Sequence, residues 1–331
     1  MRNLYLRIIS IVFSISSVGQ TKQFTIHTIA LPPEISYYDN QFSGLQISNG
    51  KLYLMAESRL QDKQEARLYS VYLSDIDRHL KDKTYILPFQ KIVIHGLDSL
   101  AGKMKNAQQD YEGLEAFVID YPNVYFSVET TTPSPYCYLL KGKLDNNNIY
   151  LEQTLLPIKK PRLPNNNIVY NAGFEAIALI QNRLNSFYEY NYFDRNYVYS
   201  YDKELTVPSR DSLIIDKLPF RITDITKKGG NHFTAINYFY KGEGADTVYR
   251  VRATDRNNAL IKTGNAYQNY CRLIDIKYNR KHFSWKPIWI FPGEYASYNW
   301  EGIAAYKKGY FIINDKYTPA RPYSSVLLYV R

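Results

Sequence analysis

The chain has 331 residues with 33 tyrosines, and its 41 lysines and arginines outnumber its 31 aspartates and glutamates, for a formal net charge of +10. This length can bury a core in one large domain or two ordinary ones. Two cysteines are too few for a disulfide framework and the five histidines lack metal-ligand spacing, which argues against a disulfide scaffold and a histidine-based zinc site.

The basic excess favours anionic partners such as phosphate esters or acidic glycans. The lysines and arginines are nevertheless scattered, with short pairs such as Lys159–Lys160 and no long basic run. We therefore expect an anionic small molecule rather than nucleic acid as the partner of a monomer, with most basic side chains on solvated surface.

The chain begins with MRNLYLRIISIVFSISSVGQ, residues 1–20, in which Arg2 and Arg7 precede an apolar stretch from Ile8 to Val18. This pattern is typical of a signal peptide, and the stretch is too short to span a membrane stably. We predict export to the periplasm or the medium, and one mature domain at 21–331 without a membrane span. A buried N-terminal strand or helix is the alternative.

Short strand-like segments separated by glycine, proline and asparagine dominate the rest of the chain, and one short helix is expected at 99–109. A first strand is expected at 22–31. Five units with similar opening phrases follow, each containing several strands, and their opening segments lie at 42–59, 111–130, 174–191, 222–240 and 300–317.

This repeat predicts an all-β protein with a single β-propeller of five blades, each built from four strands. The last unit is one strand short, so we expect the strand at 22–31 to pair with it and close the ring, which removes both sheet edges. Uneven spacing leaves a sixth blade around 246–290 as an alternative. A β-sandwich would not predict the shared opening phrase.

In a propeller the innermost strand of each blade lines a central channel, so the residues that open these strands should converge. Three carboxylates at this point would repel one another unless a cation lies among them, and oxygen ligands without histidine or thiolate indicate Ca²⁺, or else Mg²⁺. A wet channel whose carboxylates bind water and backbone amides is the alternative. The predicted metal ligands are Ser43, Glu112, Glu175, Thr223 and Glu301.

A second acidic residue ends the second strand of four units and should rim the same mouth. Glu57 and Glu129 are the candidates for a general base. Basic residues adjoin this rim, and they either hold an anionic substrate or pair with the rim acids. The acidic set is Glu57, Glu129, Glu189 and Asp315, and the basic set is Arg59, Arg221 and Lys316.

The two cysteines fall on the third strands of different units. Cys137 lies in the second unit and Cys271 in the fourth, so a whole blade should separate them. That separation exceeds the Cα distance that a disulfide tolerates. We predict two free, buried thiols.

The opening phrases of the units resemble those of the phytase-like domain family, which is also labelled "esterase-like activity of phytase". Their order covers nearly the whole mature chain. The ring of Ser, Glu, Glu, Thr and Glu is also similar, more distantly, to that of the five-bladed calcium-activated nucleotidases, or soluble apyrases. The matching phrases are Ser43-Gly44-Leu45, Asp110-Tyr111-Glu112-Gly113-Leu114, Asn171-Ala172-Gly173-Phe174-Glu175-Ala176-Ile177-Ala178 and Asn299-Trp300-Glu301-Gly302-Ile303-Ala304.

This resemblance implies an exported propeller that hydrolyses phosphate or other esters. We expect a calcium-dependent hydrolase in which Arg59, Arg221 and Lys316 hold the anionic part of the substrate. The alternative is a non-catalytic propeller that binds a glycan, peptide or protein and carries a structural metal. One departure favours it: the family often has an acidic–Arg pair where this chain reads Ile236-Asn237-Tyr238.

Overall fold

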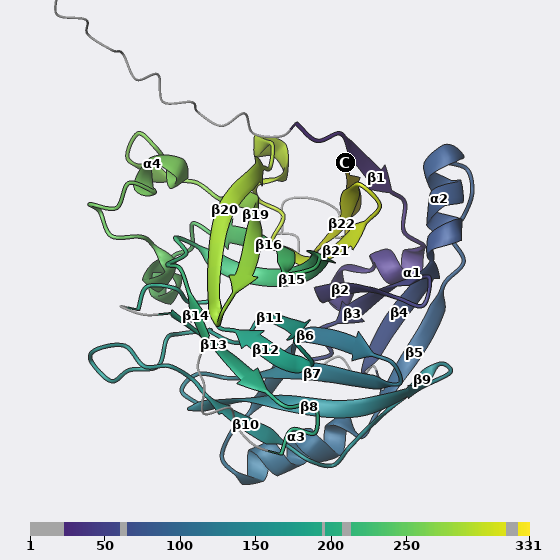
Figure 1. Cartoon of the computed structure of the whole chain (residues 1–331), viewed down its shortest axis with the longest axis horizontal. Coiled ribbons are helices and arrows are strands. Elements are labelled where there is room, and N and C mark those ends of the chain that lie inside the picture. Colours follow the sequence, from purple (N-terminus) through teal and green to yellow (C-terminus); the bar gives the residue numbers. More distant parts are fainter. Residues whose placement is uncertain (1–22, 60–64, 194–195, 207–212, 316–323) are drawn as a thin grey trace, which may run out of the picture.

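The computed structural model describes residues 23–59, 65–193, 196–206, 213–315 and 324–331. The predicted signal peptide at 1–20 and the predicted substrate-binding residue Lys316 lie outside these residues. Strands are the main secondary structure of the described chain, as the composition predicts (Figure 1). No helix among the described residues is long and apolar enough to cross a membrane.

The largest sheet joins two antiparallel groups of four strands, and their outer strands β5 and β9 pair in parallel. The short strand β10 (Leu156–Lys159) pairs with part of β8. The first group is β2 (Phe42–Ser48), β3 (Lys51–Ala56), β4 (Arg67–Tyr72) and β5 (Gln90–His95). The second group is β6 (Tyr111–Asp120), β7 (Asn123–Thr130), β8 (Tyr136–Asp145) and β9 (Asn148–Leu151).

The second large sheet repeats this plan, with β14 and β20 as the parallel outer pair. Within 246–290, where a sixth blade was an alternative, β19 and β20 instead complete the group that starts with β15. One group is β11 (Ala176–Ile180), β12 (Arg183–Phe187), β13 (Asn196–Tyr201) and β14 (Leu213–Ile215). The other is β15 (Arg221–Gly229), β16 (His232–Phe239), β19 (Tyr270–Asn279) and β20 (His282–Ile290).

The third sheet combines the two ends of the described chain. Strand β1 (Ile26–Ile29) pairs antiparallel with β23 (Leu327–Val330), with Ile26 opposite Val330. It is thereby the fourth strand of the last group. The remaining members are β22 (Gly309–Asn314) and β21 (Trp300–Tyr306).

Helices are short and lie in the connections. Helix α3 (Leu97–Asn106) confirms the helix expected at 99–109, with Leu97, Leu100 and Met104 buried. The others are α1 (Pro33–Ser36), α2 (Leu73–Lys81), α4 (Asn258–Ile261) and the 3₁₀ turns η1 (Tyr38–Asn40), η2 (Gly244–Tyr249) and η3 (Gly293–Tyr295). A small ribbon of β17 (Lys262–Thr263) and β18 (Ala266–Tyr267) follows α4.

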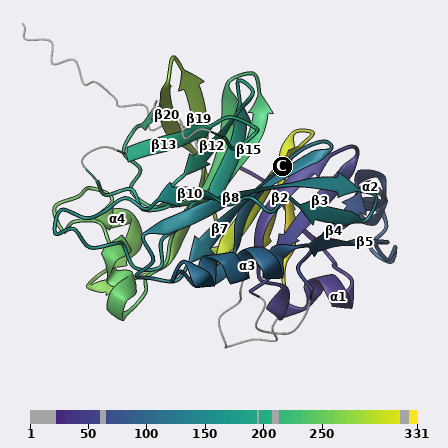
Figure 2. The ribbon, with the colours of Figure 1, turned by 90° about the horizontal axis from the view of Figure 1, so that it is seen from below.

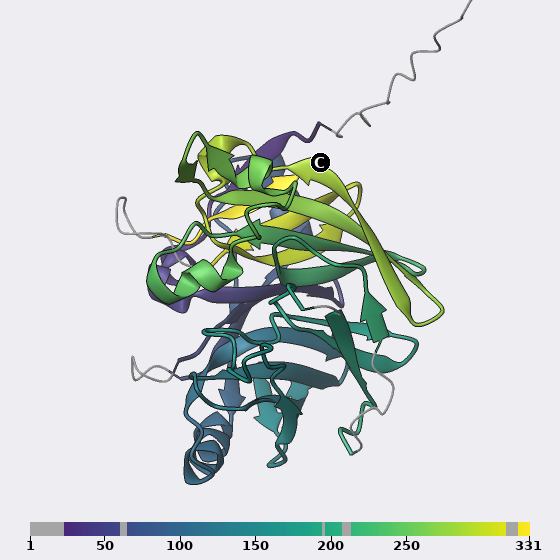
Figure 3. The same cartoon turned by 90° about the vertical axis from the view of Figure 1, so that its left-hand side faces the viewer.

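The first strands of the groups contact one another in a continuous series. Strand β2 contacts β6 and β21, β6 contacts β11, β11 contacts β15, and β15 contacts β21. Apolar clusters fill the space between neighbouring groups, as where Phe187 and Phe233 share one cluster and Trp300 and Tyr238 another. The long β19–β20 hairpin projects from one end of the molecule, and α1 and α3 lie at the other (Figures 2 and 3).

The two cysteines are unpaired. Cys137 on β8 and Cys271 on β19 are both buried, which confirms the prediction of two free thiols. Burial raises the pKa of both thiols above the usual range, so neither is an activated nucleophile at neutral pH.

Asp224 on β15 joins three inner strands through their backbone. Its carboxylate accepts hydrogen bonds from the N–H groups of Ile303 on β21 at 2.7 Å, Leu45 on β2 at 3.4 Å and the adjacent Ile225 at 2.7 Å. The side chain is buried, so these amides have no access to bulk water. The carboxylate therefore satisfies buried donors that the sheets leave open.

Replacing Asp224 by Ala should lower the free energy of unfolding by about 3 kcal/mol or more, because buried N–H groups of two other strands lose their acceptor. Urea unfolding of the purified chain measures this. Asp224→Asn keeps one acceptor oxygen and should lose clearly less. Equal stability of the Ala variant and the native chain would contradict this role.

Candidate functional site

Four of the five residues predicted to ring the axis occupy β-bulges. The ladder register shifts by one residue between Phe42 and Gly44, Tyr111 and Gly113, Ile222 and Asp224, and Trp300 and Gly302. A bulge inserts an extra residue and re-aims its side chain, which explains why one polar residue interrupts each apolar strand. The extra residues are Ser43, Glu112, Thr223 and Glu301, while Glu175 directly precedes β11.

Strand β6 carries a second bulge, between Leu114 and Ala116. Its extra residue is Glu115, three positions after Glu112. In a regular strand such residues point to opposite faces. Both nevertheless line the same cavity, because the bulge turns Glu115 towards it. Glu115 was not among the predicted site residues. A second acid inside the apolar phrase YEGLEAF was the available signal.

These side chains surround a cavity of about 470 Å³ at the start of the inner strands. Eight carboxyl groups line it against only two guanidinium groups, although the chain as a whole is basic. The cavity alone therefore favours a cation over an anion. Its lining residues are Glu57, Arg59, Glu112, Glu115, Glu129, Asn171, Glu175, Arg221, Tyr238, Tyr240, Asp246, Tyr249, Ser297, Asn299, Glu301 and Asp315.

Three carboxylates meet most closely. Glu115, Glu129 and Glu175 are all buried, and one oxygen of each lies within 4.8 Å of the others. Burial raises the pKa of Glu129 to about 8; Lys160 opposes this rise, and neighbouring carboxylates such as Glu189 add to it. Burial and then neighbouring carboxylates raise the pKa of Glu115 and of Glu175 well above the usual range.

Lys160, just after β10, is a cation beside one member of this trio, Glu129. Its side chain is fully buried, and its Nζ donates to the carbonyl of Thr130 at 2.7 Å and lies 3.8 Å from Glu129 Oε1. That oxygen has no hydrogen-bond partner within the described chain. The burial of Lys160 is an exception to the solvated surface expected for most basic side chains, and nothing local marks a lysine in a Lys-Lys-Pro segment as buried.

Three of the acids expected at the rim, Glu57, Glu129 and Asp315, line the cavity, whereas Glu189 does not. Glu57 directly follows β3 and pairs with Arg59 at 2.6 Å, and Glu189 follows β12 and pairs with Arg221 at 3.2 Å. Both arginines thus pair with acids, which is one of the two roles expected for them. Both also line the cavity. Burial, and then Asp315, raises the pKa of Glu57 to about 7, and Arg59 opposes this shift.

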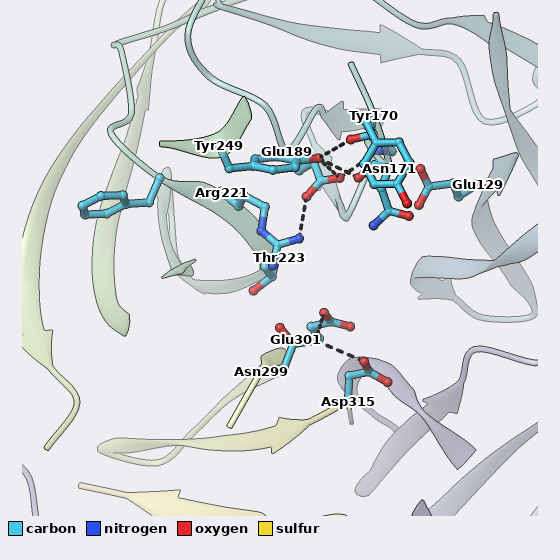
Figure 4. Close-up of polar contacts among 12 residues, drawn as sticks. Glu129, Tyr170, Asn171, Glu189, Arg221, Thr223, Tyr249, Asn299, Glu301 and Asp315 are labelled. Atoms are coloured by element: carbon cyan, nitrogen blue, oxygen red, sulfur yellow. Dashed lines mark hydrogen bonds and ion pairs between the residues drawn. The ribbon is translucent and has the colours of Figure 1, made fainter. Parts of the chain in front are cut away.

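Tyr249, on η2 in the long connection between β16 and β19, fixes the Glu189–Arg221 pair. Its hydroxyl oxygen lies 2.6 Å from the carbonyl oxygen of Asn171 and 3.0 Å from Glu189 Oε1, so its single proton is shared between these two acceptors (Figure 4). The Arg221 guanidinium lies over the rings of Tyr249 and Tyr238 at 5.1 and 5.5 Å. Tyr249 was not among the predicted site residues, because the connection that carries it does not resemble any part of the repeated units.

On the opposite wall, Asn299 links two acids. Its amide donates to Glu301 Oε1 at 2.6 Å and to Asp315 Oδ2 at 3.1 Å (Figure 4). Glu112 and Glu301 line the cavity, as predicted for the ring, but neither belongs to the close trio.

The hydroxyl groups of the predicted ring have a different place. Ser43 Oγ donates to the carbonyl of Leu114 at 2.6 Å, and Thr223 Oγ1 donates to that of Trp300 at 2.7 Å. Neither residue lines the cavity. Both instead connect one inner strand to the next, whereas Glu115 and Glu129 line the cavity.

No family model and no curated protein matches this chain. Solved structures with a similar fold include a GH43 beta 1,3 galactosidase, BT0265 (10% identity, 93% of this chain and 60% of that chain, TM-score 0.51), and the Bombyx mori GH32 beta-fructofuranosidase BmSUC1 (11%, 93% and 62%, TM-score 0.50). A bifunctional GH43-CE protein of Bacteroides eggerthii matches with a TM-score of 0.51 at 6% identity, over 91% of this chain and 34% of that chain.

The chain thus spans between about a third and less than two thirds of these proteins. At such low identities the similarity establishes only the fold. This chain has a β-propeller fold similar to that of GH43 and GH32 proteins.

Without added metal, the protein should lose stability as the pH rises from about 5 to about 8. Glu57 and Glu129 have pKa values of about 7 and about 8 in the folded chain, against an ordinary 4.5. The folded state therefore binds more protons in this window, and the free energy of unfolding falls as the pH rises. Urea unfolding at several pH values in chelator measures the slope.

Glu129→Gln is neutral throughout and should flatten this slope. A free energy of unfolding that stays constant or increases over the window would contradict the raised pKa values.

Proposed function

We propose that this chain is a five-bladed β-propeller hydrolase that uses Ca²⁺ in its central cavity to cleave phosphate or other esters. The observation that carries the proposal is the buried trio of Glu115, Glu129 and Glu175, whose oxygens approach within 4.8 Å.

The arrangement of the strand groups supports five blades and a closed ring. Each group starts with a strand that contacts its neighbours at the centre, and the pairing of β1 with β23 completes the last group. The shared opening phrase at Ser43, Glu112, Glu175, Thr223 and Glu301 then marks corresponding positions of five blades.

The residues at the centre fit a divalent cation. Three buried carboxylates with a single ammonium beside them repel one another, and a cation among them removes this repulsion. All ligands on offer are oxygens, which suit Ca²⁺ or Mg²⁺. Glu115, Glu129 and Glu175 would hold the ion, with Glu112 and Glu301 on the adjoining walls.

An anionic ester fits this cavity only with the cation present, because eight carboxyl groups would otherwise repel it. The bound ion supplies polarisation of the ester oxygen and a lowered pKa of a bound water. Arg59 and Arg221 line the cavity and would hold the anionic group of the substrate. Lys316, predicted to share this role, remains outside the described residues.

With Glu129 assigned to the cation, Glu57 is the candidate general base. Its Oε2 is buried without a hydrogen-bond partner in the described chain, and its pKa of about 7 suits proton transfer near neutral pH. Glu57 would take a proton from the attacking water as the water oxygen bonds to phosphorus or the acyl carbon. It would return that proton to the leaving alcohol as the ester bond breaks.

A glycoside hydrolase that works without metal is the second candidate. Two observations favour it: fold relatives include a galactosidase and a fructofuranosidase, and the cavity holds close carboxyl groups of raised pKa. Glycosidases of this kind use one carboxylic acid to protonate the leaving oxygen and a second carboxylate as base or nucleophile.

Calcium should raise the thermal stability of the chelated protein, because a ligand that binds only the folded state stabilises it by about 2.7 kcal/mol at a hundredfold excess over Kd. Glu175→Gln should lose this shift and lower ester turnover by about 100-fold. The matched control Glu152→Gln changes an exposed glutamate outside the cavity and should keep both. An undiminished Glu175→Gln enzyme would refute the proposed centre.

Chelation separates the candidate functions. The ester hydrolase should lose turnover of p-nitrophenyl phosphate and p-nitrophenyl acetate in excess EDTA and recover it with Ca²⁺. Turnover of aryl galactosides or of sucrose that persists in EDTA would instead identify the glycosidase. Calcium stabilisation without turnover of any of these substrates would favour the non-catalytic propeller.

A further inference from the structure

The hairpin turns of the fourth strand group form a basic surface at the end of the group opposite to its cavity residues Arg221 and Tyr238. Residues 227–232 read KKGGNH and residues 277–282 read KYNRKH, with no aspartate or glutamate in either segment. Lys227, Lys228, Lys277 and Arg280 are all exposed. We call these two segments the basic hairpin surface.

The two hairpins form one continuous surface. His232 pairs with Lys277 across the β16–β19 ladder, and the N–H of Tyr278 donates to the carbonyl of Asn231 at 2.9 Å. The hairpins rise together at the end of the molecule away from α1 and α3 (Figure 2). The cavity lies at the starts of the first strands, whereas these turns follow their ends, so the two charged regions occupy opposite ends of the group.

Among the described residues, two carboxylates at this end of the group pair with histidines. Asp275 faces His232, with Oδ2 3.5 Å from Nδ1, and Asp216 faces His282 at 2.8 Å. Acidic groups at this end of the group are thus directed at histidines. The side chains of Lys227, Lys228, Lys277 and Arg280 are exposed to solvent.

We propose that the basic hairpin surface binds a linear acidic polysaccharide. Closely spaced cations on an exposed edge attract a polyanion through charge rather than shape. The segments offer no exposed tyrosine, phenylalanine or tryptophan on which a base could stack, since Tyr278 is buried, and no exposed apolar side chain to enter a membrane. Glycine, asparagine and histidine between the cations can hydrogen-bond to hydroxyl groups. This surface is independent of the proposed hydrolase.

Binding of fluorescein-labelled heparin to the full chain, followed by anisotropy at low and moderate salt, tests the proposal. Changing Lys227, Lys228, Lys277 and Arg280 together to Gln should weaken binding about tenfold or more. Affinity of the native chain should fall steeply with salt. A matched control changes the exposed Lys81, Lys105, Lys143 and Lys159 to Gln, which removes the same charge elsewhere.

The control should lose less than about threefold in affinity, since screened charges away from the site contribute little. Equal losses in both variants would show that only net charge matters and would overturn the proposal. So would tighter binding of the native chain to duplex DNA or to phosphatidylserine vesicles than to heparin, or no binding to heparin at all.

Discussion

The structure depends on one electrostatic constraint, which is the burial of several carboxyl groups around a common centre. Each ionised carboxylate there costs free energy through lost hydration and through repulsion by its neighbours. The chain meets this cost partly with fixed cations, as Lys160 lies beside Glu129, Arg59 pairs with Glu57, and Arg221 pairs with Glu189. Burial, and then the neighbouring carboxylates, raises the pKa of all three carboxyl groups of the trio above the usual range.

The backbone around this centre is built for close approach. A Cβ on Gly302 would lie 2.6 Å from Ile313, and one on Gly113 would lie 2.6 Å from Glu57, so only glycine fits where these strands meet the rim. Side-chain hydroxyls at Ser43 and Thr223 and the carboxylate of Asp224 then bind backbone groups of neighbouring strands. Polar residues near the axis therefore divide into those that hold the strands together and those that face the cavity.

Charge is segregated along the fourth strand group. Its β15–β16 and β19–β20 turns carry exposed lysines and arginine, whereas its other end contributes Arg221 to a cavity in which acids predominate. The positive net charge of the chain therefore describes its surface and not its centre. The net charge of the chain does not by itself favour an anionic ligand in the cavity. Such a ligand needs a bound cation that reverses the local field.

Local sequence determined much of this protein, namely the strand segments, the glutamates that open inner strands, the acids at Glu57, Glu129, Glu189 and Asp315, and the separation of the cysteines. Each of these features can be recognised from a short stretch of sequence or from its place in the repeated units. Tertiary structure alone decided which polar residues face the cavity. Glu115 lines the cavity because a second bulge reverses the direction of its side chain. Lys160 lies beside Glu129 because β10 pairs with β8. Tyr249 contacts Glu189 from a connection that has no counterpart in the repeated units. Side-chain direction in a strand depends on ladder register and on partners distant in sequence, which alternation within one segment does not encode.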